Sequence, residues 1–271
     1  MRVLANSVQK SGTHLLLRLL EQLGVPRFPR WRLDPEWTLE RSLAKRLRMS
    51  PPGVGQPVGI GRGVTVSSWW LDRLFAEMPP SSALLAHCGH TTAIAERLLV
   101  NRVRTLCIVR DPRDVAVSHA HFLMKIGKDK ITRKPEHRAL VELPDHGARM
   151  LALLRGHPGT PSIAERFNEF LGWKDHDDVH VVRFEDLVGA AGGGDDSTQR
   201  TTIARVSQYL DLERSAEQIE EIRAALFGGT ATFRKGTTEQ WRAEFGPEHR
   251  RVARRTLGPT LSAFGYALDD D

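Results

Sequence analysis

The residues best suited to chemistry stand near the N-terminus, in the run Lys10, Ser11, Gly12 and Thr13. Lysine supplies a mobile positive charge, and glycine lets the backbone approach a ligand closely. The apolar run before them, residues 3–8, predicts a short buried strand, and leucines at helical spacing after them predict a helix. Because the first turn of a helix has free N–H groups and the positive end of the dipole, this strand–turn–helix unit predicts an anion site.

The turn does not match the pattern of P-loop nucleotide hydrolases. That pattern, Gly-x-x-x-x-Gly-Lys-Ser/Thr, places the lysine after the second glycine, whereas here Lys10 precedes Gly12. Ordinary P-loop NTPase chemistry is therefore disfavoured. Short turns of Gly, Ser and Thr are also common in α/β cores, so a turn without a ligand is the alternative that this stretch alone leaves open.

Two further basic segments follow elements that the sequence predicts. A buried strand over residues 104–109 ends at Arg110, and Ser118 falls on the helix that comes next. The second segment is a late loop that carries Arg234, Lys235 and Gly236. Arginine pairs with phosphate through two parallel hydrogen bonds. Each segment is a weak signal alone, but with the first turn they predict a pocket for a ligand that has two separated phosphate-like groups.

At these three places the sequence resembles the PAPS-dependent sulfotransferase family, where PAPS is 3′-phosphoadenosine 5′-phosphosulfate. Residues 9–15 are Gln-Lys-Ser-Gly-Thr-His-Leu, and the family has Pro-Lys-Ser-Gly-Thr-Thr-Trp. Residues 110–114 are Arg-Asp-Pro-Arg-Asp with a serine on the next helix, as in the family's 3′-phosphate motif. Residues 234–242 are Arg-Lys-Gly-Thr-Thr-Glu-Gln-Trp-Arg and are similar to the family's Arg-Lys-Gly-x-x-Gly-Asp-Trp-Lys. The three occur in the family's order and span most of the chain.

The resemblance implies transfer of a sulfuryl group from PAPS to a hydroxyl or amine acceptor by in-line displacement, with release of adenosine 3′,5′-bisphosphate (PAP). It implies that Lys10 stabilises the leaving phosphate oxygen and that His87 takes the acceptor's proton. His87 stands where the family has a histidine after its second strand, and His90 is a close rival. A histidine of near-neutral pKa suits a general base. PAPS is the implied co-substrate, and no metal is implied.

The resemblance also assigns the residues that contact the nucleotide. The 5′-phosphosulfate is assigned to Lys10, Ser11, Gly12, Thr13 and His14. The 3′-phosphate is assigned to Arg110 and Ser118, together with the late loop of Phe233, Arg234, Lys235 and Gly236. Phe184 replaces the tyrosine of the family's Tyr-Glu-Asp motif, and Leu15 replaces the tryptophan that stacks on adenine. What stacks on the adenine here is therefore open.

The elements that must position these residues alternate along the chain. Strands are predicted near residues 3, 83, 105 and 180, with helices between them. This alternation predicts an α/β three-layer sandwich, in which helices cover both faces of a mostly parallel, P-loop-like sheet, in a single domain over residues 1–271.

Other stretches carry more local predictions. Residues 26–63 predict a long irregular connection with one helix over 35–48. Residues 189–198, rich in Gly and Asp, predict a flexible surface loop. A basic helix is predicted over residues 248–257. Two serines followed three residues later by Glu or Gln, at Ser162 and Ser215, predict helix capping boxes.

Composition sets outer bounds. The 271 residues, 40% hydrophobic and 27% charged, indicate a globular protein with a sizeable core rather than a disordered or fibrous chain. No apolar run approaches a membrane-spanning length, and the N-terminus does not resemble a signal peptide. The only two cysteines, Cys88 and Cys107, indicate no disulfide framework, so a cytoplasmic location is expected. The net charge of +6 fits an anionic ligand without identifying it.

We expect a small-molecule or glycan acceptor as partner, without nucleic-acid binding or stable membrane insertion, while the acceptor's identity and the oligomeric state are open. Two other functions compete with this one. A nucleotide or small-molecule kinase has Asp111 and Glu185 available for magnesium, but the order of Lys10 and Gly12 is wrong for it. A non-catalytic protein that binds RNA or an anionic glycan would use the basic helix over residues 248–257.

Overall fold

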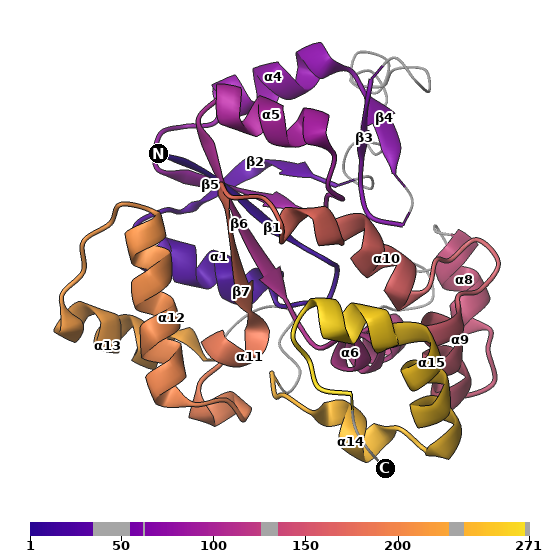
Figure 1. Ribbon diagram of the computed structural model, residues 1–271. Helices are drawn as coiled ribbons and strands as arrows, with labels where there is room; N and C mark the ends of the chain where they lie inside the picture. The colour runs from indigo at the N-terminus through magenta and orange to yellow at the C-terminus, as the bar shows by residue number, and fades with distance from the viewer. Residues whose placement is uncertain (35–54, 62, 126–134, 228–235, 269–271) are drawn as a thin grey trace. The chain divides into compact units, whose positions relative to one another are not determined.

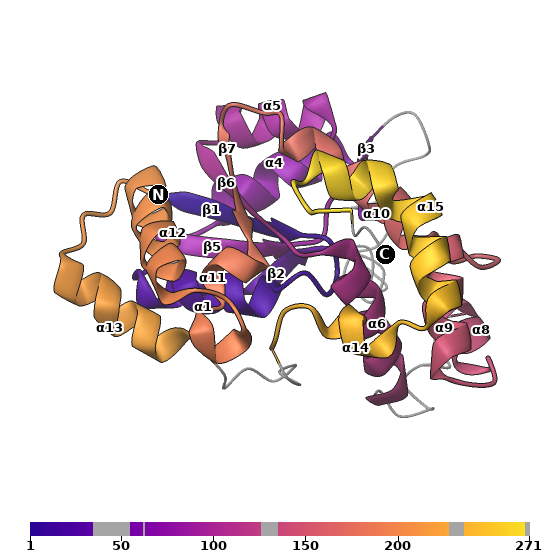
Figure 2. The same ribbon diagram turned by 60° about the horizontal axis from the view of Figure 1, so that its bottom comes forward.

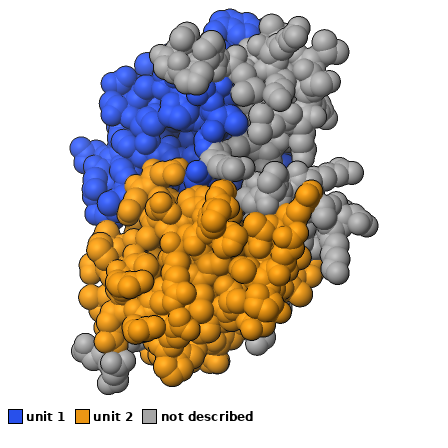
Figure 3. All heavy atoms as spheres, turned by 90° about the vertical axis from the view of Figure 1, so that its right-hand side faces the viewer, with its two compact units in different colours: residues 1–109, 170–238 blue, residues 110–169, 239–271 orange. Residues whose placement is uncertain are grey.

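The structure is a computed structural model. It describes residues 1–34, 55–61, 63–125, 135–227 and 236–268. The chain divides into two compact units (Figure 3). Unit 1 comprises residues 1–109 and 170–238, and unit 2 comprises residues 110–169 and 239–271.

Unit 1 is built on a five-stranded sheet in the order β2-β5-β1-β6-β7, in which every pairing is parallel (Figure 1). Its strands are β1 (Arg2–Ser7), β2 (Arg27–Leu33), β5 (Ser82–Ala86), β6 (Val103–Val109) and β7 (Val179–Arg183). The central strand β1 pairs Asn6 with Ala86 of β5 and Ser7 with Ile108 of β6. Since the strands are parallel, the chain leaves all of them at one edge of the sheet.

Helices cover both faces of this sheet, so that β1 and β5 are buried along almost their whole length. The views of Figure 1 and Figure 2 agree that α1, α12 and α13 lie on one side of the sheet and α4 and α5 on the other. These helices are α1 (Thr13–Gln22), α4 (Ser68–Glu77), α5 (Thr92–Val100), α12 (Asp196–Tyr209) and α13 (Ala216–Leu226). On the first side Leu16, Ile203 and Ile222 belong to one apolar cluster with Val3 and Ile108 of the sheet.

The predicted fold class is confirmed, and four of the five strands fall where the sequence predicted them. The prediction of an irregular connection over residues 26–63 is wrong in part, because β2 occupies its start. β2 pairs with β5 through a register shift between Arg27 and Arg32. A small antiparallel hairpin of β3 (Gln56–Val58) and β4 (Val64–Val66) follows. The predicted helix over residues 35–48 lies outside the described residues.

Short elements complete unit 1 after β6. They are the 3₁₀ turn η1 (Leu171–Trp173), the helix α11 (Phe184–Leu187) and the 3₁₀ turn η2 (Ala190–Gly192). The predicted surface loop over residues 189–198 contains η2 and a tight turn, in which the N–H of Gly194 donates to the carbonyl of Gly189 at 2.9 Å, and its last residues begin α12. Asp195 then caps α12 by accepting from the N–H of Thr198 at 2.7 Å.

In the part that the structure describes, unit 2 consists of helices joined by turns. They are α6 (Pro112–Lys125), α8 (Pro135–Val141), α9 (His146–Arg155), α10 (Ile163–Phe170, whose last residue belongs to unit 1), α14 (Gln240–Glu244) and α15 (Pro247–Ala263). α15 packs on α9 and α6, and α14 packs on α6. The rings of Phe167 and Phe264 meet edge to face with centroids 5.5 Å apart in the core of the unit. Among the helices that the structure describes, none is both long enough and apolar enough to cross a bilayer.

Candidate active site

The turn after β1 is held in an unusual backbone conformation. The N–H of Ser11 donates to the carbonyl of Val8 at 3.1 Å, while Lys10 and Gly12 take positive φ angles of 74° and 103°. A Cβ on Gly12 would lie 2.7 Å from the ring of Phe184, so close packing as well as φ requires glycine here. The turn therefore delivers Thr13 directly into the first turn of α1.

The N-terminus of α1 is suited to an anion. No side chain caps it, whereas each of α4, α5, α9, α12 and α13 is capped by the side chain of a Ser, Thr or Asp. Ser11 is fully buried, and its hydroxyl has no hydrogen-bond partner among the described residues. Free N–H groups, the helix dipole and an unused buried hydroxyl together fit a phosphate or sulfate group.

His87 follows β5 and joins this turn through a chain of hydroxyl groups. Its Nδ1 lies 2.9 Å from the carbonyl oxygen of Ser7 and 3.3 Å from the hydroxyl of Ser7. The Ser7 hydroxyl in turn lies 2.6 Å from that of Thr13 at the start of α1. Because a carbonyl only accepts, Nδ1 carries the proton, and the lone pair of the neutral ring is on Nε2.

The surroundings of His87 keep the ring neutral. Burial lowers the pKa of His87 below its usual 6.5, and the nearby charges of Arg32 and Lys10 act in the same direction. The hydrogen bond to Ser7 and the charge of Asp34 oppose this shift of the pKa. His87 is thus neutral at physiological pH, with an imidazole nitrogen that can accept a proton.

Asn6 holds the segment that carries His87 in place. The side-chain amide of Asn6 donates to the carbonyl of Cys88 at 2.9 Å and accepts from the N–H of Cys88 at 3.0 Å. The indole N–H of Trp173 donates to the same carbonyl at 2.9 Å. Neither Asn6 nor Ser7 was predicted as a site residue, although two polar residues inside an apolar strand were a visible signal.

His90, the rival candidate, lies in different surroundings. Its ring packs edge to face on Trp173 with centroids 5.0 Å apart, and a Cβ on Gly172 would lie 2.4 Å from its Nδ1. Its Nε2 is buried without a hydrogen-bond partner in the described part of the chain. Burial, and then the neighbouring His176, lower the pKa of His90. Of the two histidines, only His87 is hydrogen-bonded to the residues around the Lys10 turn.

The Arg110 segment begins unit 2 directly after β6. The guanidinium of Arg110 donates to Asp114 at 3.1 Å, and Asp114 also accepts from the backbone N–H of Trp241 at 3.0 Å. Burial raises the pKa of Asp114, while Arg110 and the N–H of Trp241 oppose the shift. Ser118 is the one residue from Arg110 to Ala120 that is not buried. Asp114 thus orients Arg110 just before α6, and the half-buried Ser118 lies on that helix.

Most of the remaining residues predicted to bind the nucleotide lie in unit 1. His14 is partly exposed on α1, beside the turn, and burial together with the charges of Arg27 and Lys10 lowers its pKa. Phe184 lies in the apolar core of unit 1, against Gly12. Gly236 takes a φ of 62° in unit 1. The structure brings Lys10, Ser11, Gly12, Thr13, His14, His87 and Phe184 together in unit 1, whereas Phe233, Arg234 and Lys235 lie outside the described residues.

The sequence matches a known protein family over nearly its whole length. The profile of the family described as "Sulfotransferase domain" matches residues 2–265. Sulfotransferase 6B1 of Pan troglodytes is 24% identical over 184 residues, which are 62% of this chain and 54% of the relative. The chain therefore spans about half the length of that relative.

Two solved structures resemble the fold. Mouse sulfotransferase SULT7A1, complexed with PAP, superposes with a TM-score of 0.62 at 14% identity, over 98% of this chain and 89% of that one. Retinol dehydratase, in complex with androsterone and PAP, superposes with a TM-score of 0.60 at 18% identity, over 96% of this chain and 81% of that one. At these identities the likeness supports the fold.

Proposed function

The chain belongs to the sulfotransferase domain family, and from that premise we propose that it transfers a sulfuryl group from PAPS to an acceptor hydroxyl or amine. PAPS supplies the sulfuryl group, which moves to the acceptor atom as the bond to the phosphate oxygen breaks and PAP is released. The observation that carries the proposal is the hydrogen-bonded chain from Thr13 through Ser7 to His87, because it joins the anion-ready turn to a neutral base.

The roles proposed within unit 1 follow from charge and hydrogen bonding. The first N–H groups of α1 and the Ser11 hydroxyl bind the 5′-phosphosulfate, and Lys10 stabilises the negative charge that grows on the leaving phosphate oxygen. His87 takes the acceptor's proton on Nε2 while Nδ1 stays hydrogen-bonded to Ser7. Charge that develops on the imidazole is stabilised by Asp34, whose field raises the pKa of His87.

The proposed 3′-phosphate site belongs to the Arg110 segment. Arg110 and Ser118 bind this group, and Arg234, Lys235 and Gly236 complete the set. Two features support this assignment: Arg110 follows the last residue of β6, and β6 is the direct neighbour of β1, which ends just before the Lys10 turn. Segments that leave adjacent parallel strands start from one edge of the sheet, where ligands of open α/β folds bind.

The proposed acceptor is a small organic molecule with a nucleophilic hydroxyl. The retinol dehydratase structure, solved in complex with androsterone and PAP, supports this class for a chain of the same fold. A glycan acceptor, a single domain over residues 1–271 and a cytoplasmic location stay predictions from the sequence.

The test is an assay of PAPS-dependent sulfation with a panel of small hydroxyl and amine acceptors, in which the release of PAP is measured. We expect Lys10→Ala and His87→Ala each to lower kcat by about 10²–10³-fold. Lys174→Ala is the matched control, because Lys174 lies on the surface of unit 1 in an ion pair with Asp175. Unchanged rates in both variants would remove the assigned chemistry. Stabilisation by ATP and magnesium, but not by PAP, would favour a kinase instead.

A further inference from the structure

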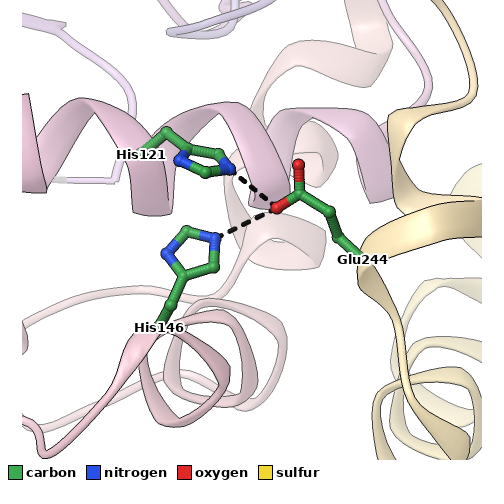
Figure 4. Close-up of side chains that lie close together, drawn as sticks. All are labelled: His121, His146 and Glu244. Atoms are coloured by element: carbon green, nitrogen blue, oxygen red, sulfur yellow. Dashed lines mark hydrogen bonds and ion pairs between the residues drawn. The ribbon is translucent and has the colours of Figure 1, made fainter.

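A cluster of three metal-binding side chains lies in unit 2, apart from the residues assigned to sulfuryl transfer. Figure 4 shows His121 of α6, His146 at the start of α9 and Glu244 at the end of α14 turned toward one another. Both imidazole Nε2 atoms approach the same oxygen, Oε2 of Glu244, at 2.7 Å for His121 and 3.1 Å for His146. The two rings lie with centroids 4.1 Å apart.

The types of these side chains point to a particular class of ion. Two imidazoles and one carboxylate suit zinc and its first-row neighbours, whereas magnesium and calcium prefer oxygen ligands alone. The potential ligand atoms all lie within 4.8 Å of one another. Around a tetrahedral zinc with bonds of about 2.0–2.1 Å, ligand atoms lie roughly 3.3 Å apart. The contact of His121 with Glu244, at 2.7 Å, would then lengthen by about 0.6 Å, and that of His146, at 3.1 Å, by about 0.2 Å.

The side chains of the cluster are partly exposed to solvent. The exposed fractions of the side chains of His121, His146 and Glu244 are 30%, 31% and 21%, which leaves an open side for ion entry and for a water as fourth ligand. In the metal-free state each histidine donates an Nε2 proton to the carboxylate. A bound ion would take both Nε2 lone pairs, and each proton would then reside on Nδ1 of its ring.

Contacts around the cluster hold the segments that carry its three ligands. Asp114 and His121 lie about two turns apart on one face of α6, and they contact the two ends of α14 through Trp241 and Glu244. His249 joins the segments next to Glu244 and His146. Its Nδ1 accepts from the N–H of Gly246 at 3.2 Å, and its Nε2 donates to the carbonyl of Gly147 at 3.0 Å. Such support is what a preorganised metal site requires.

We propose that His121, His146 and Glu244 bind one divalent transition-metal ion of the zinc class, with water as the fourth ligand. The ion would fasten α14 to α6 and α9 and so act as a structural clamp within unit 2. The proposal stands independently of PAPS, because none of the three side chains is assigned to the nucleotide or to the acceptor.

The full-length protein, stripped with a chelator, is titrated with Zn²⁺ alone and, in parallel, with Co²⁺. We expect one ion per chain, visible d–d bands of four-coordinate Co²⁺ and a Tm that rises until one equivalent has been added. In Glu244→Gln and His146→Ala the Kd for Zn²⁺ should rise at least tenfold. The glutamine of the first variant keeps the shape of the side chain, so its fold should survive even if His146→Ala destabilises the protein.

The matched control is Glu142→Gln, which neutralises an exposed carboxylate between α8 and α9, outside the cluster. It should bind Zn²⁺ with the Kd of the unaltered chain. Absence of stoichiometric Zn²⁺ binding by the unaltered protein would mean that the cluster is held by hydrogen bonds only, and would overturn the proposal. Binding that survives unchanged in Glu244→Gln would overturn it as well, because the ion would then lie elsewhere.

Discussion

At the scale of single residues, the direction of one hydrogen bond decides which nitrogen of His87 is available. The Ser7 carbonyl fixes the proton on Nδ1, and burial keeps the ring neutral by lowering its pKa. The hydroxyls of Ser7 and Thr13 extend this contact to the first turn of α1. The base and the proposed phosphosulfate site therefore share one hydrogen-bonded network.

The pH profile of sulfation is the first prediction at this scale. The pKa of His87 in the folded protein lies below 6.5, so the base is fully active at pH 7 and loses its lone pair only as the pH falls below that value. We expect kcat/KM to be flat near pH 7 and to fall on the acid side of 6.5. In His87→Gln this acid limb should vanish along with most of the activity. An acid limb that persists in the variant would assign it to another group.

Asn6 provides a second prediction. Asn6→Ala removes both bonds to Cys88 and leaves the buried N–H of Cys88 without its acceptor, which should lower the free energy of unfolding by about 1–3 kcal/mol. Because the segment after β5 would no longer hold His87 in position, we expect the fold decrease in kcat to exceed the fold increase in the KM for PAPS. Urea denaturation and steady-state rates measure the two effects.

The control for Asn6 is Asn101→Ala, since in the described part of the chain the side chain of Asn101 bonds only the carbonyl of Arg97 at the end of α5. It should leave kcat unchanged. Equal values of kcat in Asn6→Ala and the unaltered protein would show that His87 keeps its position without this amide.

At the scale of elements, the glycine-rich turn after α11 forms a contact surface for the late loop. The carbonyl of Gly192 accepts from the N–H of Thr238 at 2.9 Å, and the carbonyl of Gly193 accepts from the hydroxyl of Thr238 at 3.2 Å. A Cβ on Gly192 would lie 2.7 Å from the carbonyl oxygen of Gly236. The absence of side chains in the turn is what allows the segment of Gly236 to approach.

We therefore expect Gly192→Ala to displace the segment from Gly236 to Thr238 and to raise the Kd for PAP several-fold. The same added methyl group would meet Val188 at 2.2 Å, so a loss of stability should accompany the weaker binding. Calorimetric titration with PAP and a thermal melt measure the two effects. Gly258→Ala is the control, because Gly258 lies inside α15 and, among the described residues, its Cβ would meet only Leu268, at an ordinary contact distance of 3.8 Å. Equal PAP affinity in Gly192→Ala would contradict this role of the turn.

Local patterns predicted the elements whose signals are local. The serine caps at Ser162 and Ser215 form the reciprocal bonds that their spacing indicated, and the four apolar strands lie where predicted. β2 escaped prediction because its Arg- and Pro-rich sequence is extended through pairing with β5, which no local pattern reveals. The prediction that the basic helix ends at residue 257 was wrong, since α15 continues through Pro259 to Ala263 with Leu261 buried.

In the candidate site, too, the residues in local motifs were predicted, and those brought together only by the fold were not. The Lys10 turn and the Arg110 segment were recognisable because each is a continuous stretch of unusual residues. The contact of Asn6 with Cys88 joins residues 82 positions apart, and its partner is backbone, which has no sequence signature. The cluster of His121, His146 and Glu244 was equally invisible, because its members come from three separate helices.

At the scale of the whole molecule, the pH dependence of stability should reflect histidines that are neutral in the folded protein. Burial is the largest cause of a lowered pKa at His14, His87, His90 and His180. Between their folded pKa values and 6.5 the unfolded chain binds protons that the native chain does not. The free energy of unfolding should therefore fall as the pH drops below 6.5.

Urea denaturation between pH 7.5 and pH 5 measures this slope, in a range above the window in which carboxylates such as Glu220, with a pKa of about 2, become protonated. In His180→Gln the slope should be shallower, because one of the four groups no longer titrates. His180 stacks on Tyr209 with centroids 5.1 Å apart, and neither residue has a role in the assigned chemistry. A slope equal to that of the unaltered chain would exclude His180 as a contributor.

The strand β2 has one more consequence. Among the described strands, β2 is an edge strand of the five-stranded sheet. Its third residue, Pro29, has no backbone N–H that could donate a hydrogen bond to another strand. A register shift between Arg27 and Arg32 bends the same edge, and both arginines add like charge along it. Foreign extended segments find few places to dock on such a margin. The same irregular sequence that made β2 hard to predict therefore also disfavours aggregation through edge-to-edge strand pairing.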